Sequence, residues 1–104
     1  MTIQFNTSNN MNGSETMNTR LSAIIAEKMN RFSEYITRIE AHLSDANGKK
    51  EGQNDKQCVL EARLEGLQPI AVTSAAGTYD EAVIAAIGKL KSTLDTTIGK
   101  LRSH

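Results

Sequence analysis

Apolar residues recur at helical spacing along residues 78–101 and predict one long amphipathic helix. At about 100° per residue, six of them fall in one narrow stripe, and these are Val83, Ile87, Leu90, Leu94, Ile98 and Leu101. Such a stripe must pack on an apolar surface, and the only candidate of sufficient size in this chain is a β-sheet. The two edges of the stripe carry cations, which are Lys89 and Lys100 on one edge and Lys91 and Arg102 on the other. We therefore expect the inner face to close a core and the edges to present positive charge to a partner.

A second helix is predicted for residues 15–32, where one face carries Met17, Leu21, Ile25, Met29 and Phe32. Lys28 falls within this face, so we expect its aliphatic stem to lie along the face while its ammonium group reaches water. Arg20 and Arg31 lie on one flank together with Glu27. Taken alone, these charges have the ordinary interpretation of a solvated helix edge.

Alternation of apolar and polar residues predicts four strands, at residues 2–6, 38–43, 58–65 and 70–74, with polar loops at 7–13 and 44–56. The order β-α-β-β-β-α predicts a single α+β domain over residues 1–104, built on a four-stranded mixed sheet. A right-handed crossover makes the first two strands parallel, and the last three form an antiparallel meander. Both helices are expected on one face of the sheet, because the other face carries Arg38, Glu40, His42, Glu61, Arg63 and Glu65.

The overall charge excludes a protein that coats nucleic acid by bulk attraction, because 12 basic residues balance 12 acidic ones. An anion site must therefore come from local segregation of charge. With no Trp, two Phe and two Tyr, a stacking platform for single-stranded bases is not expected. We expect no secretory leader, and no apolar run approaches the roughly 20 residues that span a bilayer. We expect a soluble cytoplasmic protein without a membrane partner.

The residues that carry chemistry form no catalytic constellation. Cys58 stands alone within an apolar run and is interpreted as a small core side chain. His42 and His104 do not combine with it at any metal-ligand spacing. Glu40 and Glu61 are expected to face each other across two strands, but an open sheet lacks the desolvated cleft that acid–base catalysis needs. We therefore expect no catalytic residues, metal, cofactor or small-molecule substrate.

Several segments are typical of one known family. They are residues 27–32 (EKMNRF), 36–40 (ITRIE), 42–45 (HLSD), 60–66 (LEARLEG), 68–73 (QPIAVT) and 79–90 (YDEAVIAAIGKL). Together with the order of the elements, they make nearly the whole chain resemble the ribosome hibernation-promoting factors. This family is also called the ribosome-associated inhibitor or sigma-54 modulation proteins.

The resemblance implies a translation inhibitor that docks on the small ribosomal subunit, in the channel used by messenger and transfer RNA. Family members present cations from two helices to the phosphates of ribosomal RNA, and their occupancy favours inactive ribosomes in starved cells. By position, Lys28 and Arg31 match basic sites of the first helix, and Lys89 matches a basic site of the second. We expect the RNA-binding cations to gather on one electropositive surface, and the candidates are Arg20, Lys28, Arg31, Lys89, Lys91, Lys100 and Arg102.

Two departures from the family pattern favour an alternative. Residues 95–97 (DTT) replace a basic cluster, and residues 7–9 (TSN) replace a Gly-Arg-His segment. We expect Asp95 to weaken the field of Lys91 and Arg102. The alternative is a protein-interaction module that keeps the family fold and has lost affinity for ribosomal RNA. The resemblance also implies a short form without the C-terminal dimerisation domain, whereas the oligomeric state does not follow from the sequence.

Overall fold

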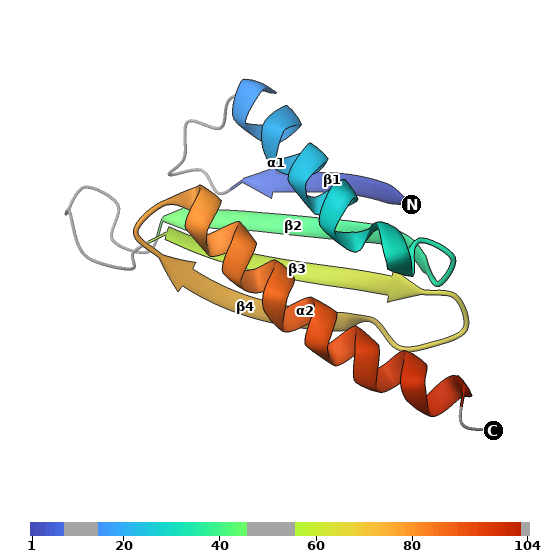
Figure 1. Cartoon of the computed structure of the whole chain (residues 1–104). Helices are drawn as coiled ribbons and strands as arrows, with labels where there is room; N and C mark the ends of the chain where they lie inside the picture. Colours follow the sequence, from blue (N-terminus) through green and yellow to red (C-terminus); the bar gives the residue numbers. More distant parts are fainter. Residues whose placement is uncertain (8–14, 46–55, 103–104) are drawn as a thin grey trace.

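The computed structural model of the chain describes residues 1–7, 15–45 and 56–102, so the greater part of both predicted loops and His104 lie outside it. Its elements have the predicted order β-α-β-β-β-α, and the α+β class is confirmed (Figure 1). Their bounds are β1 (Thr2–Thr7), α1 (Glu15–Met29), the 3-10 turn η1 (Asn30–Phe32), β2 (Ile36–Asp45), β3 (Lys56–Leu64), β4 (Ile70–Ala76) and α2 (Tyr79–Arg102). Neither helix in this part of the chain has the length and hydropathy of a membrane span.

The four strands form one mixed sheet in the order β1-β2-β3-β4. β1 lies parallel to β2, with Thr2 opposite Arg38 and Thr7 opposite Leu43. The pairs β2–β3 and β3–β4 are antiparallel, as predicted for a meander. Both helices cover the same face of the sheet, with α1 on the side of β1 and α2 over β3 and β4 (Figure 1). The two helices thus lie next to each other as one layer.

The core lies between this helical layer and the sheet. The first helical segment contributes Leu21, Ile25 and Met29 from α1 and Phe32 from η1. The second contributes five residues of the predicted stripe, which are Val83, Ile87, Leu90, Leu94 and Ile98. Alternate residues of the two central strands close the core from below, and these are Ile36, Ile39, Ala41, Leu43, Cys58, Leu60, Ala62 and Leu64. Three apolar stripes therefore meet, and each element has one buried and one solvated face.

Leu101 departs from the predicted stripe, because its side chain is 46% exposed. The C-terminal end of α2 runs past the sheet, so its last turn has no strand beneath it (Figure 1). Leu101 instead lines a shallow pocket of about 190 Å³, together with Tyr35, Leu64 and Leu67. The prediction was wrong at this position because periodicity gives the direction of a side chain but not the extent of the surface below it.

The first helical segment also ends differently from the prediction. Its α-helical part stops at Met29, and the chain continues as the tighter turn η1, in which the Ser33 amide donates to the Asn30 carbonyl at 3.0 Å. A 3-10 turn rotates the chain by about 120° per residue instead of 100°. Phe32 is thereby buried while its neighbour Arg31 remains exposed.

The second helix begins at a side-chain cap. The hydroxyl oxygen of Thr78 accepts a hydrogen bond from the backbone amide of Glu81 at 3.1 Å. Asp80 and Glu81 also place two carboxylates in the first turn, where they interact favourably with the helix dipole. Asp80 therefore has a local role in starting α2, in addition to the contact described below.

Cys58 is fully buried, as the sequence predicted, and burial raises the pKa of its thiol to about 12. Because only the thiolate attacks thiol reagents, we expect Cys58 in the native protein to react with such a reagent at pH 8 at least about 100-fold more slowly than a free cysteine. Time-resolved labelling checks this, and the same protein in denaturant is the control in which rapid reaction is expected. Rapid labelling of the native protein would contradict the burial of this strand.

Candidate nucleic-acid interface

Two ion pairs join the helical segments across their boundary. The guanidinium of Arg20 in α1 lies 2.7 Å from the Asp80 carboxylate in α2. Arg31 in η1 lies 2.9 Å from Asp95, farther along α2. The order of these partners means that the two helical segments run in the same direction, as Figure 1 shows. In each pair an arginine of the first segment meets an aspartate of the second.

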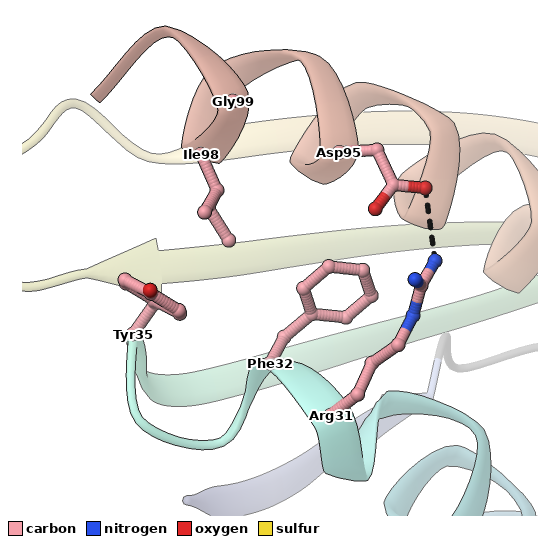
Figure 2. A pocket seen from close by; sticks show the side chains of 6 residues that line it. All are labelled: Arg31, Phe32, Tyr35, Asp95, Ile98 and Gly99. Atoms are coloured by element: carbon pink, nitrogen blue, oxygen red, sulfur yellow. Dashed lines mark hydrogen bonds and ion pairs between the residues drawn. The ribbon is translucent and has the colours of Figure 1, made fainter. Parts of the chain in front are cut away.

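A pocket of about 270 Å³ lies beside the second ion pair. It is lined by Arg31, Phe32, Tyr35, Asp95, Ile98 and Gly99 (Figure 2). The Arg31 guanidinium carbon lies 4.4 Å from the centre of the Phe32 ring, so the cation rests on an aromatic face. Figure 2 shows the Arg31 side chain extending from η1 toward α2, where the Asp95 carboxylate accepts its hydrogen bond. The ring and the carboxylate together fix the position of this cation.

Two further cations belong to the same boundary. Lys28 lies three residues before Arg31 and is exposed. Lys91 is partly exposed and lies one helical turn before Asp95, on the side of α2 that meets the first segment. Among the described residues, neither lysine has a carboxylate or other hydrogen-bond partner. We call Arg20, Lys28, Arg31 and Lys91, with the partners Asp80 and Asp95, the interhelical surface.

The remaining predicted cations lie elsewhere. Lys89 donates to the backbone carbonyl of Thr73 in β4 at 2.7 Å, so it lies on the outer side of α2, away from α1. Lys100 follows Lys89 by three turns and lies on the same outer side. Arg102 ends α2, and its side chain lies outside the described part of the chain. Of the seven predicted residues, Arg20 and Arg31 thus lie at the boundary by their ion pairs and Lys28 and Lys91 on the same side by helical spacing, while Lys89 and Lys100 lie apart from them.

The aspartates of the interhelical surface are functional candidates whose partners in the first helical segment were not predicted from the sequence. Asp95 was expected to act on Lys91 and Arg102 within α2, but its ion pair is with Arg31. The partners are separated by 60 and 64 residues along the chain. Helical periodicity assigns Asp80 and Asp95 to one edge of α2, but it does not identify the residues that face that edge from another element.

The opposite face of the sheet carries a separate charge network. Glu40 accepts from Arg63 at 3.2 Å and lies 3.6 Å from Arg38, while Glu61 lies 3.1 Å from Arg63. Partial burial favours the neutral form of Glu40, but the hydrogen bond with Glu61 and the charges of Arg38 and Arg63 outweigh it and lower the pKa of Glu40 below its usual value. These carboxylates face each other in register, as predicted. The arrangement balances charge across neighbouring strands and leaves little net positive potential on this face.

His42, another residue considered for chemistry, also lies on this sheet. His42 is exposed on the charged face, where its Nδ1 lies 3.4 Å from the Asn6 amide nitrogen on β1. Across residues 1–7, 15–45 and 56–102, no group of three or more His, Cys, Asp or Glu side chains has the arrangement needed to hold a metal ion.

Comparison with known proteins agrees with this architecture. The sequence profile of the family described as sigma 54 modulation protein / S30EA ribosomal protein matches residues 7–102. A ribosomal subunit interface protein from Coxiella burnetii is similar in structure, with a TM-score of 0.71 and 18% identity over 95% of this chain and 99% of that chain. The N-terminal domain of Protein Y from Thermus thermophilus has a TM-score of 0.67 and 14% identity, over 92% of this chain and 94% of that chain. A search of curated proteins found no significant match.

Proposed function

We propose, because the chain belongs to the sigma 54 modulation protein / S30EA ribosomal protein family, that it is a ribosome-associated translation inhibitor. In this proposal it binds the small ribosomal subunit and its ribosomal RNA through the cations of its helical layer. The family is one of ribosome-associated factors and not of enzymes, and ribosomes are the partner that it implies. The single domain would act in the cytoplasm, where ribosomes are.

The observation that carries the proposal is the two ion pairs at the boundary between α1 and α2, which involve Arg20 and Arg31, with Lys28 and Lys91 on the same side by helical spacing. Lysine and arginine bind RNA mainly by replacing the counterions condensed on its phosphates. The chain as a whole is neutral, so this attraction must be local. Both arginines on the opposite face of the sheet are paired with carboxylates, whereas the interhelical surface also carries Lys28 and Lys91, which have no carboxylate partner among the described residues. We therefore propose that the helical layer faces the ribosomal RNA.

Within that layer we assign the first contacts to Lys28 and Lys91, since their charges have no carboxylate partner among the described residues. Arg20 and Arg31 join the contact after exchanging an aspartate for a phosphate. Lys89 and Lys100 extend the site toward β4 and reach phosphates at its border, and Arg102 continues it at the end of α2.

Co-sedimentation with purified small ribosomal subunits over a salt series tests the proposal. We expect association near 50 mM salt and its progressive loss by several hundred millimolar, because the affinity for a polyanion falls linearly with the salt concentration on logarithmic axes. A protein that remains in the supernatant even at the lowest salt concentration would reject ribosome binding through phosphate contacts.

A second candidate function is a protein-interaction module without affinity for ribosomal RNA. The two ion pairs favour it, because they neutralise half of the cations on the interhelical surface. A pull-down from lysate treated with ribonuclease separates the candidates. A protein partner that survives this treatment supports the module, whereas loss of all captured material supports the ribosomal function.

A further inference from the structure

Asp80 and Asp95 each accept from one nitrogen of an arginine that an RNA-binding surface would use. Asp80 Oδ1 accepts from an Arg20 nitrogen at 2.7 Å, and Asp95 Oδ2 accepts from an Arg31 nitrogen at 2.9 Å. The four side chains are 44–57% exposed, so both pairs are accessible from solvent. The same arrangement thus occurs at two places along the boundary of the helices.

Each aspartate opposes a phosphate in two ways. The guanidinium N–H groups that donate to a carboxylate are not available to a phosphate oxygen at the same time. The carboxylate also repels any phosphate that approaches the same arginine. Exposed ion pairs are weak, so a phosphate can still displace the aspartate, but the gain is reduced by the contact that it breaks.

We infer that Asp80 and Asp95 are attenuating residues that lower the affinity of the interhelical surface for RNA. This inference rests on the proposed function, because it concerns the same site. In the free protein the arginines are held by the chain's own carboxylates, while Lys28 and Lys91 remain available. The bound state exchanges two internal ion pairs for two phosphate contacts. A neutral chain thereby obtains a reversible interaction in place of a tight one.

Replacement of Asp95 tests the inference more directly than replacement of Asp80, because the position of Arg31 does not depend on its carboxylate partner alone. The guanidinium of Arg31 rests on the Phe32 ring, so it is already held beside the pocket before any RNA approaches. Removing the Asp95 charge leaves that placement intact and weakens the competition for the Arg31 donors, because a neutral amide oxygen is a weaker acceptor than a carboxylate. Asp80 has a second role in the first turn of α2, so its replacement changes the helix start as well.

The test is a titration of purified small ribosomal subunits with the full chain and with D95N and D80N/D95N at about 100 mM salt. We expect D95N to bind roughly threefold and the double variant roughly tenfold more tightly than the wild type. The slope of affinity against salt concentration should steepen by about one unit for each arginine released. E61Q is the matched control, because Glu61 is also paired with an arginine, at 3.1 Å, but on the opposite face of the sheet. It should leave the affinity unchanged.

A double-mutant cycle identifies the released group. D95N should gain little in an R31Q background if its effect is the release of Arg31. An equal gain in both backgrounds, or an equal gain from E61Q, would overturn the inference, since either result reports only a change in net charge. If the wild type binds and D95N binds no more tightly, the inference is overturned but the proposed function stands. Failure of the wild type and of all variants to bind would reject both.

Discussion

Simultaneous charge reversal of Lys28 and Lys91 is expected to weaken binding to small ribosomal subunits on the order of 100-fold near 100 mM salt. K28E/K91E removes two cations from the interhelical surface and adds two repulsive charges. It therefore changes the local charge by four units where no carboxylate partner moderates it. The dissociation constant from a sedimentation or fluorescence titration measures the effect. The slope of affinity against salt concentration should also decrease by about two units.

The matched control for this variant is K89E/K100E, which makes the same change in charge on the outer side of α2. We expect a smaller loss, roughly tenfold, because these lysines lie at the border of the proposed contact. Both double variants should keep the melting temperature within a few degrees of the wild type, since exposed helix positions tolerate substitution. Equal losses from the two variants would contradict the assignment, because binding would then follow net charge and not the interhelical surface.

Truncation of Leu94 is expected to destabilise the protein by roughly 2–5 kcal/mol. Leu94 is 0% exposed and lies in the middle of the α2 stripe, above the sheet. Leu94→Ala removes three carbon atoms from a packed site and leaves a cavity that the surrounding strands cannot close. Chemical denaturation measures the loss in the free energy of unfolding, and a thermal melt should fall by at least about 10 °C for a domain of this size.

Leu101→Ala is the control for this truncation, because it makes the same chemical change in the same helix. Its side chain is 46% exposed past the end of the sheet, so the expected cost is below about 1 kcal/mol. Comparable costs at the two positions would mean that α2 does not lie on the sheet as described. A small cost for Leu94→Ala would contradict the core itself.

The sequence predicted the fold because each buried face has a simple period. The α2 stripe from Val83 to Ile98 and the alternation in β2 and β3 determine which side of each element is buried. Once the element order is known, the handedness of the crossover and the charged sheet face leave one arrangement of the layers. The exposure of the Leu101 side chain could not be predicted from periodicity, because it depends on where the sheet ends under α2.

The site was less predictable than the fold. Periodicity placed Lys89 and Lys91 on opposite edges of α2, and the structure agrees with that separation. It did not determine which edge faces α1, so it did not show that Lys89 lies apart from Arg20 and Arg31. The partners of the two arginines depend on how far the helices are offset along each other, and no local pattern encodes that offset.

The hydrogen bond from Lys89 to Thr73 has a consequence for how the protein behaves in a crowded solution. β4 is a terminal strand of the sheet, and its outer backbone groups offer a template to which a strand of another molecule can add. Lys89 donates to the Thr73 carbonyl of this strand and sets a positive charge beside it. A neutral protein has little overall repulsion to keep its copies apart, so we expect a cation beside this edge strand to disfavour the addition of a strand from another molecule.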